Sequence, residues 1–309
     1  MTDTQHVHIL LASHNGGKFL RQQLLSLLDQ THQNWSLWVS DDGSTDNTRS
    51  VVEQFCDENP DRQITLLNGP CRGHAQNFLS LLKHSDIPLG YVATSDQDDV
   101  WLPHKLTRGL EKLAAAPQGG PLLYGGRTSI VEEDLSGSLM SPLFKRPPSF
   151  RNALVQNVMG GNTHILNPAA VELVRKTPDG LGIWYVDWWL YQLVSGCGGG
   201  IIFDFEPGVL YRQHDNNVIG SFTGTKACAG RIWMLLSGYF RNWNDENIRA
   251  LTKIEAMLTP ENRKILAGFR QGRQNWGLRA WAMFRQVGLY RQTKLGDLSL
   301  FLAAIMHKM

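Results

Sequence analysis

Residues Gly90–Trp101 read GYVATSDQDDVW, an apolar run of strand type that passes directly into an acidic turn. The turn carries three carboxylates, Asp96, Asp98 and Asp99, and like charges at this spacing repel one another. Burying such a cluster at the end of a strand is costly unless a positive partner compensates it. We therefore predict a strand whose carboxyl end holds, or receives, a positive group. The following LPHKL is typical of a helix start.

Three earlier runs have the same organisation, a compact apolar segment followed by a polar turn and a helical pattern. The runs are Val7–Ser13 (VHILLAS), Ser36–Ser40 (SLWVS) and Ile64–Asn68 (ITLLN). Strands that alternate with helices predict βαβ units and a mostly parallel sheet covered on both faces. Ligands collect at the carboxyl ends of strands in such sheets. The turns ASHN, DDGS and SDQDD should therefore converge on one site.

The rest of the chain is less regular. It predicts a strand at Pro121–Gly126, a loop entering a strand at Asn157–Asn167, a helix at Ile183–Val194 and two short strands joined by a turn in GGGIIFDFEPGVLYRQH. From about Ser221 the pattern is helical and rich in Trp and Arg.

Charge is distributed unevenly along the 309 residues. Residues 1–220 carry 16 Lys and Arg against 23 Asp and Glu, whereas residues 221–309 carry 14 against 5. An acidic body with a basic tail indicates two different tasks. Basic and aromatic residues on amphipathic helices suit an anionic membrane surface, and helices packed on the body with aromatic core residues are the alternative. The acidic body argues against nucleic-acid binding.

Composition and cysteine spacing place the chain among ordinary globular proteins of a reducing cytoplasm. Its four cysteines are far apart and form no C-x-x-C pair. The N-terminal segment lacks the basic start and long apolar run of a signal peptide. Because no run of about 18 apolar residues exists, we expect no transmembrane helix.

The acidic turn is compatible with a solvated loop or with a site for a hard divalent cation such as Mg²⁺ or Mn²⁺. An EF-hand is excluded, because Trp101 stands where that loop needs glycine. Similarly, Asp41–Thr48 (DDGSTDNT) could be a turn with a helix cap, or a strand end whose carboxylate accepts a nucleobase imide N–H. HNGGKF follows the first strand in place of a P-loop or G-x-G-x-x-G, which weakens ATPase and NAD-binding interpretations.

ILLASHNGGKFLRQQLLSLLDQT, WVSDDGSTDNT and SDQDDVWLPHKL together resemble the family 2 inverting glycosyltransferases, and SDQDDVW is most similar to their bacterial rhamnosyltransferase-like branch. The resemblance runs in order from about Val7 to Gly220. It implies an α/β fold of GT-A type, a Rossmann-like and mostly parallel sheet flanked by helices. It also implies a catalytic domain at 1–220, with a nucleotide-binding half to about residue 120 and an acceptor-binding half at 121–220. A helical C-terminal region at 221–309 would follow.

The resemblance assigns the nucleotide-diphospho-sugar donor to a group of small and polar residues from four segments. These are Ala12, Ser13 and Asn15, the pair Asp41 and Asp42, Gly73 and Asn77, Asp96, and the glycine-rich loop with Gly161 and Asn162. Ala12-Ser13-His14 departs from the commoner Pro-Thr-Tyr of the family, so side-chain contacts there are in doubt although a backbone lining is not.

The same resemblance assigns a Mn²⁺ or Mg²⁺ ion to Asp98 and His214, where the metal would bridge the diphosphate, and the catalytic base to Asp187 in YVDWWLY. Inverting transfer needs one general base for the acceptor hydroxyl. A dipole-favoured Asp at a helix start is the alternative. Aromatic neighbours would raise a carboxylate pKa and suit a sugar, so Trp188 and Trp189 are the expected acceptor contacts. Arg212 could face the phosphates.

The sequence and the resemblance together predict a cytoplasmic, metal-dependent enzyme. Its C-terminal helices either contact the inner face of the inner membrane or only pack on the body, and both alternatives stay open. It would move a sugar, with rhamnose from dTDP-rhamnose as candidate, to a glycan or lipid-linked acceptor in surface polysaccharide synthesis. Two alternatives stay open, a sugar-phosphate nucleotidyltransferase and a non-enzymatic carbohydrate- or nucleotide-binding module.

Overall fold

The computed structural model of the chain describes residues 5–214 and 239–309. At its centre lies a seven-stranded sheet in the order β10-β6-β9-β4-β1-β2-β3. All neighbours pair in parallel except β9, which runs antiparallel to both β4 and β6. The strands are β1 (Val7–Ser13), β2 (Trp35–Asp41), β3 (Ile64–Asn68), β4 (Tyr91–Ser95), β6 (Leu122–Gly126), β9 (Ile165–Leu166) and β10 (Gly200–Asp204).

A second, four-stranded sheet in the order β5-β11-β7-β8 stands beside the acidic turn. It brings the end of β11 close to the residues that follow β4, because β11 pairs with β5 directly after the turn. Sequence reasoning predicted β11 but not this sheet. Its strands are β5 (Val100–Trp101), β7 (Ser129–Val131), β8 (Leu139–Met140) and β11 (Val209–Arg212).

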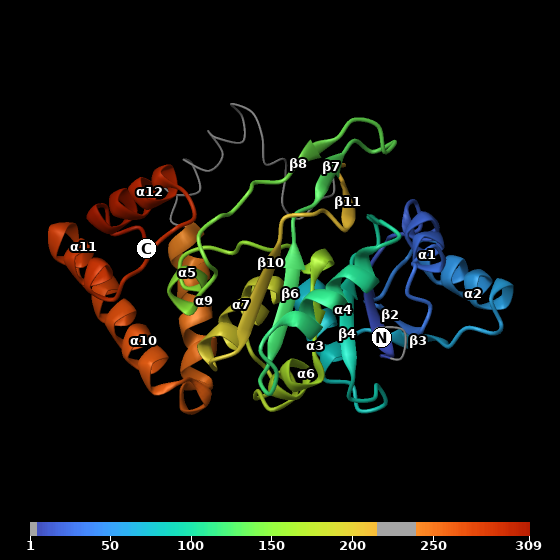
Figure 1. Cartoon of the computed structure of the whole chain (residues 1–309), viewed down its shortest axis with the longest axis horizontal. Helices are drawn as coiled ribbons and strands as arrows, with labels where there is room; N and C mark the ends of the chain where they lie inside the picture. The colour runs from blue at the N-terminus through green and yellow to red at the C-terminus, as the bar shows by residue number, and fades with distance from the viewer. Residues whose placement is uncertain (1–4, 215–238) are drawn as a thin grey trace.

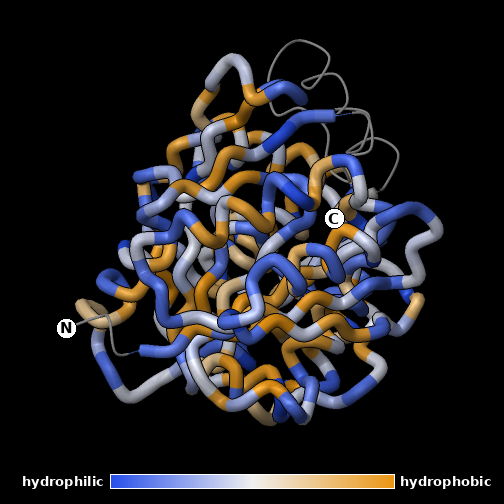
Figure 2. Tube along the Cα trace, turned by 90° about the vertical axis from the view of Figure 1, so that its right-hand side faces the viewer, coloured by the Kyte–Doolittle hydropathy of each residue, from blue (hydrophilic) through white to orange (hydrophobic). Residues whose placement is uncertain are grey.

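Helices cover both faces of the central sheet, as the alternating pattern predicts (Figure 1). Side chains of β1 divide by the period of two: Leu10 and Ala12 pack with α3, α6 and α7, whereas Ile9 and Leu11 pack with α1, α2 and α4. Figure 2 shows hydrophobic stretches of chain running through the middle of the molecule. The helices are α1 (Leu20–Leu28), α2 (Thr48–Glu58), α3 (His74–Leu82), α4 (Lys105–Ala115), α5 (Phe150–Ala153), α6 (Pro168–Arg175) and α7 (Val186–Gly196), with the 3₁₀ turn η1 (Gly161–Thr163).

The C-terminal helices lie at one end of the sheet, beyond α7 and β10 (Figure 1). Their buried side chains, among them Leu251, Phe269 and Phe284, belong to the same hydrophobic cluster as Leu190 and Tyr191 of α7. The sequence boundary at 220/221 falls outside the described residues, and the division into domains stays a prediction. The elements are α9 (Tyr239–Lys253), η2 (Glu255–Met257), α10 (Pro260–Arg273), α11 (Gly277–Gln286) and α12 (Lys294–Ile305).

Among the helices of the described residues, none combines the length and the apolar character that crossing a bilayer requires. Cys56, Cys71 and Cys197 are free thiols, in agreement with their wide spacing, and Cys228 lies outside the described residues.

Candidate active site

Three polar turns meet at the carboxyl ends of β4, β1 and β2, which are adjacent in the sheet. Gln97 accepts hydrogen bonds from Ser13 Oγ and the His14 N–H, each at 2.8 Å, and its Nε2 donates to the His14 carbonyl at 3.0 Å. On the other side, Asn15 Oδ1 accepts from the Thr45 N–H at 2.8 Å. The predicted convergence is therefore confirmed. Gln97, which joins the first and last of these turns, was quoted in the motif but given no role.

Asp42 and Asp41, at the end of β2, are both buried. Asp42 accepts the backbone N–H groups of Cys71 at 2.6 Å and Gly73 at 2.8 Å. It therefore fixes the loop before α3, where Gly73 adopts φ 85°. Asp41 receives Arg49 Nη1 at 3.2 Å. Of this pair, Asp42 supports the loop through both carboxylate oxygens.

Two further residues assigned to the donor lie behind the site surface. Asn77 is 1% exposed, accepts the Ser40 hydroxyl and donates to the Ser40 carbonyl at 2.9 Å. Ala12 is 5% exposed with its side chain in the core. In this structure both hold β1, β2 and α3 in place, and their side chains face away from solvent.

Each carboxylate of the acidic turn has its own partner. His74 Nε2 lies 3.1 Å from Asp96 Oδ1, and His214 Nε2 lies 2.9 Å from Asp98 Oδ2. Asp99 is fully buried, where it accepts the Asn162 amide and, at 3.3 Å, the Arg212 N–H. The positive partners that the sequence demands are thus partly supplied by the protein itself, from α3 and from the end of β11.

Burial and mutual repulsion still disfavour charge on this turn. Burial, reinforced by Asp96, raises the pKa of Asp98, and His214 opposes the shift. Burial, with the charges of Asp98 and Asp96, raises the pKa of Asp99 well above its usual range. The turn would therefore be stabilised by a further cation.

Lys105 is a buried cation directly behind the turn. Its Nζ donates to the Asn162 carbonyl at 2.7 Å and lies 3.0 Å from the centre of the Trp101 ring. Burial lowers its pKa well below the usual range, and the charge of Asp99 opposes the shift. Asn162 thus bridges Asp99 and Lys105, so its side chain positions the turn.

Arg212, for which the sequence suggests a place facing the phosphates, holds several partners within the protein. Its Nε donates to the Asp98 carbonyl at 2.9 Å, and its other nitrogens reach the Glu133 carbonyl and Gln22 Oε1. The side chain therefore braces the acidic turn against β11 and the β7–β8 hairpin. A guanidinium held in this way is a support for the backbone of Asp98.

Asp187 is the second residue of α7, the position that the sequence assigned to it. Its Oδ1 accepts the Trp188 N–H at 2.7 Å and its Oδ2 accepts Asn157 Nδ2 at 2.9 Å. Burial raises its pKa to about 6, partly opposed by the Trp188 N–H and by His74. Such a carboxyl is ionised at neutral pH yet basic enough to accept a proton.

Asp187 faces the acidic turn across the glycine-rich loop. A Cβ on Gly161 would lie 3.4 Å from the Asp187 Cβ, and the Gly161 carbonyl accepts the hydroxyl of Thr94, at the end of β4. Besides burial, the negative charge of Asp96 contributes to the raised pKa of Asp187. Gly161 therefore lies between Asp187 and the end of β4. The structure thus brings the predicted base and the acidic turn together.

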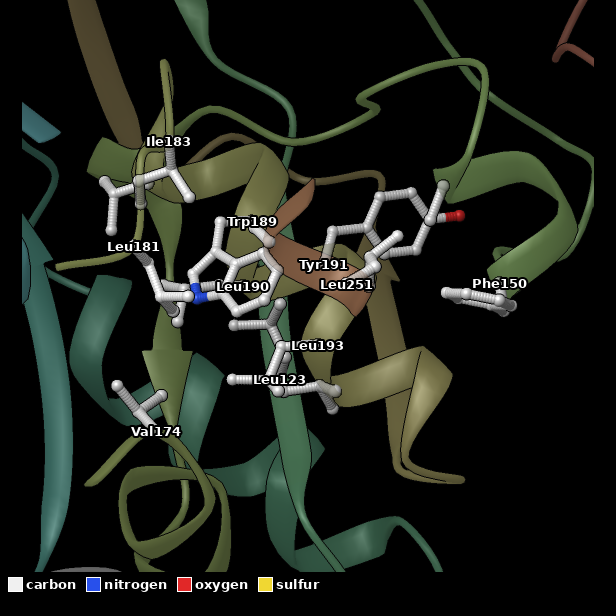
Figure 3. Packing of buried hydrophobic residues seen from close by; sticks show 14 of the residues in the cluster. Leu123, Phe150, Val174, Leu181, Ile183, Trp189, Leu190, Tyr191, Leu193 and Leu251 are labelled. Carbon is white, nitrogen blue, oxygen red and sulfur yellow. The ribbon is translucent and has the colours of Figure 1, made fainter. Parts of the chain in front are cut away.

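Trp188 and Trp189 correct the expectation for the acceptor. Trp188 is 6% exposed and donates its Nε1 proton to the Ala153 carbonyl at 2.6 Å; Trp189 is fully buried. Figure 3 shows the Trp189 ring packed beside Leu181 and Leu190. Both rings are core residues and offer no surface to a sugar. Trp184, just before α7, is 54% exposed instead.

Asp98 and His214 fit a divalent cation by donor chemistry, because a carboxylate oxygen and an imidazole nitrogen lie side by side, 2.9 Å apart. Within the described residues no cluster of three or more His, Cys, Asp or Glu has metal-ligand geometry. A metal held here would need ligands from a phosphorylated substrate, as Mg²⁺-type sites often do.

Comparison with known proteins decides the family. Residues 8–164, half of the chain, match the family model described as Glycosyl transferase family 2. The chain belongs to this family. It is a glycosyltransferase, and neither the nucleotidyltransferase nor the non-enzymatic alternative is retained.

Individual relatives agree with this assignment. The dTDP-rhamnosyl transferase RfbG of Shigella flexneri is 26% identical over 245 residues, 75% of this chain and 81% of that protein. WfgD of Escherichia coli, a UDP-Glc:alpha-D-GlcNAc-diphosphoundecaprenol beta-1,3-glucosyltransferase, is 30% identical over 140 residues, 45% of this chain and 53% of that protein.

Solved structures confirm the GT-A fold. The Pyrobaculum calidifontis mannosyltransferase PcManGT, in complex with GDP-Man and Mn²⁺, has a TM-score of 0.51 and 16% identity, covering 97% of this chain and 88% of that one. S. aureus TarS in complex with UDP-GlcNAc has a TM-score of 0.55 and 12% identity, covering 91% and 90%. At these identities the likeness concerns the fold alone.

Proposed function

We propose that this family 2 glycosyltransferase transfers a sugar with inversion from a nucleotide-diphospho-sugar to a hydroxyl of a glycan or lipid-linked acceptor, with help from Mn²⁺ or Mg²⁺. The observation that carries the proposal is the placement of Asp187. A carboxyl with a pKa raised to about 6 lies at a helix start next to the acidic turn. Asp187 would then serve as the base on one side of the site, and the acidic turn on the other side would hold the metal that binds the diphosphate.

In the proposed reaction Asp187 takes the proton of the acceptor hydroxyl as that oxygen attacks the anomeric carbon. The bond from this carbon to the diphosphate oxygen breaks, and its electron pair leaves with the nucleoside diphosphate. Attack opposite the leaving group inverts the configuration. Asn157 and the Trp188 N–H hold one carboxylate oxygen each, so the base keeps its orientation while a lone pair stays available.

Asp98 and His214 would hold the metal, and Asp96, tied to His74, would face the donor beside them. The metal, when bound, stabilises the negative charge of the departing diphosphate. Asn15, which is exposed, would line the nucleoside, with the buried Ser13 and Asp41 directly behind it. Trp184, as the exposed ring near Asp187, would stack on the acceptor sugar.

The donor is proposed to be dTDP-rhamnose and the product a surface polysaccharide. The proposal is supported by the motif SDQDDVW, which resembles the rhamnosyltransferase-like branch of the family. It is also supported by the relative RfbG, which is described as a dTDP-rhamnosyl transferase. An acceptor on a lipid places the enzyme at the cytoplasmic face of the inner membrane, and the C-terminal helices are the proposed contact.

A donor screen tests the proposal directly. The full chain is incubated with dTDP-rhamnose, UDP-glucose and GDP-mannose, with Mn²⁺ or with EDTA, and release of nucleoside diphosphate is measured. We expect release from one donor, stimulated by the metal and by a lipid-linked saccharide, and a product of inverted anomeric configuration by NMR. Retention of configuration would contradict Asp187 as sole base, and release that EDTA leaves unchanged would contradict the metal.

A further inference from the structure

The outer face of α11 and α12 carries a stripe of exposed apolar side chains, here called the apolar stripe. Its most exposed members, Leu295, Trp276 and Leu278, have 78%, 75% and 72% of their surface accessible. The stripe is composed of Trp276, Leu278, Leu295, Leu298, Leu302 and Met306.

The stripe is continuous across the two helices. Leu295, Leu298, Leu302 and Met306 recur every three or four residues and therefore share one face of α12. His307 Nδ1 donates to the Asn275 carbonyl at 3.0 Å, which places the end of α12 beside Trp276. The buried residues Leu300, Ala303 and Ala304 occupy the opposite face. Helix α12 is thus apolar on the side that faces the core and on the side that faces solvent. Packing against the core explains only the apolar residues on the inner side.

A basic pocket of about 510 Å³ adjoins the stripe, here called the arginine pocket. Its charged lining comes from α9, α10 and the C-terminal residues, namely Arg241, Asp245, Arg270, Arg273 and His307. The pocket meets the stripe at two points, since its lining residues Gln274 and His307 are two residues and one residue away from Trp276 and Met306.

The arginine pocket has more positive charge than its own carboxylates compensate. Arg273 pairs with Asp245 at 2.8 Å and Arg270 with Glu255 at 2.9 Å. Among the residues that the structure describes, no carboxylate pairs with Arg241, whose side chain is exposed. Guanidinium groups with spare donors suit a phosphate.

We propose that the C-terminal helices form a binding site for anionic phospholipids, in which the arginine pocket receives a phosphate headgroup and the apolar stripe enters the acyl boundary. The site gives the membrane contact proposed above a location and a ligand chemistry, and rests on that part of the proposal only. A second copy of the chain fits the stripe less well, because the exposed Arg279 and Lys294 beside it would meet their own like charges. An anionic bilayer satisfies the apolar and the charged surface together.

The test uses the full chain, without donor or acceptor, in sedimentation with two kinds of vesicle. One kind is phosphatidylcholine alone and the other is equal parts phosphatidylcholine and phosphatidylglycerol. We expect binding to the second kind. Arg241→Gln should weaken it about fivefold, since one basic residue near an anionic surface is worth about 1 kcal/mol. Arg241→Lys should retain it.

The stripe is tested with Trp276→Ser/Leu278→Ser, for which we expect at least about a tenfold loss of binding, because two large apolar groups leave the bilayer. Matched controls on the body, Leu89→Ser and Lys112→Glu, change an exposed leucine and an exposed cation and should bind like wild type. Nucleoside diphosphate binding, measured with Mn²⁺ on every variant, should stay unchanged. Failure of glycosyl transfer is thereby distinguished from failure of lipid binding.

Three results would overturn the proposal. Equal binding to both kinds of vesicle would remove the role of the arginine pocket. If the control variants on the body lost vesicle binding as strongly as the stripe variant, the apolar stripe would have no specific role. Saturable stabilisation by inorganic phosphate, without vesicle binding, would make the pocket a site for a soluble anion. Trp276→Phe adds an independent measurement, because quenching of tryptophan emission by brominated lipid should decrease while vesicle binding persists.

Discussion

The carboxyl edge of the central sheet and the C-terminal helices differ in how their charged side chains are compensated. At the sheet edge Asp96, Asp98 and Asp99 are each joined to a partner inside the protein, and burial disfavours further negative charge there. In the C-terminal helices guanidinium groups exceed their carboxylates, and apolar side chains face solvent.

The difference is consistent with the two ligands proposed above. A buried acidic turn with fixed partners is preorganised for a small, defined ligand such as a metal with a diphosphate. A basic pocket beside exposed leucines is suited to an extended surface. The two regions should therefore fail independently, and the following predictions test this independence, beginning with the largest effect.

Asp187→Asn should abolish transfer while sparing the other functions. A positioned base typically supplies about 10²–10⁴ in rate, so the loss should fall on kcat, measured by steady-state transfer assays. Affinity for a nucleoside diphosphate and binding to vesicles should not change. Glu206→Gln is the control, since Glu206 is an exposed acid. Transfer by the Asp187 variant within a few-fold of wild type would show that another group is the base.

Asp204, a buried carboxylate at the end of β10, is not equivalent to Asp187. It pairs with Arg108 through both oxygens, at 2.6 and 2.9 Å, and accepts the Tyr124 hydroxyl at 3.1 Å. These bonds, led by the one from Arg108, lower its pKa despite burial. A carboxylate stabilised in this way is a poor proton acceptor.

Asp98→Ala should have the next largest effect and act on donor binding first. Asp98 is one of the two proposed protein ligands of the metal. Its removal should weaken nucleoside diphosphate binding in Mn²⁺ by about 10–100-fold, the range typical for losing a side chain that supports a metal ligand. Isothermal titration with Mn²⁺ and with EDTA measures it. Vesicle binding should stay at the wild-type level. Wild-type affinity with unchanged metal dependence would remove the metal from this turn.

The rate of transfer should depend on pH through Asp187. Its pKa is raised to about 6, so the carboxyl is increasingly protonated, and inactive as a base, below that pH. We expect kcat to fall about tenfold per pH unit well below 6 and to be level above it. Rates at saturating donor and acceptor, from pH 5 to 8, give the profile. An increase in kcat below pH 6 would exclude a deprotonated carboxyl as the base.

Much of the sheet edge could be predicted because it depends on local sequence. Apolar runs followed by polar turns define β1, β2 and β4, and parallel pairing alone brings their ends together. Gln97 could not be assigned in the same way, because its contacts with Ser13 and His14 appear only in the structure. The resemblance of YVDWW to the family's motif predicted that Asp187 lies at a helix start.

The features that could not be predicted from the sequence depend on long-range packing. Whether Trp188 faces an acceptor or the core depends on the Ala153 carbonyl of α5, which is 35 residues away and has no sequence signal. His74 meets Asp96 only because α3 starts beside the end of β4. The antiparallel β9 has two residues, too few to show a period. Exposure of Leu295 and Leu302 could not be read from α12, whose sequence is apolar on nearly every side.

Higher ionic strength should weaken vesicle binding several-fold more than it weakens nucleotide binding. Surface electrostatics is screened by salt, whereas buried pairs are screened much less. Raising NaCl should release the protein from anionic vesicles and leave the metal-dependent nucleotide affinity much less affected. Sedimentation and titration in the same buffers compare the two. Parallel loss of both activities would show that they share one surface.

The smallest effect concerns stability and again involves Asp187. Its folded-state pKa of about 6 lies above that of an unfolded aspartate, so the folded protein binds the proton more tightly. Ionisation therefore costs stability, and the cost should appear between about pH 4 and 6 and be constant above. Asp187→Asn removes this cost and keeps a side chain of similar size. At pH 7 the variant should be more stable by about 1–2 kcal/mol, with a Tm a few degrees higher. Near pH 4 the difference should vanish.

Chemical denaturation of both proteins across this range measures the difference in stability, with Glu206→Gln as the exposed control. A variant less stable than wild type at pH 7 would mean that the bonds from Asn157 and the Trp188 N–H outweigh burial, and that Asp187 is held ionised by its partners.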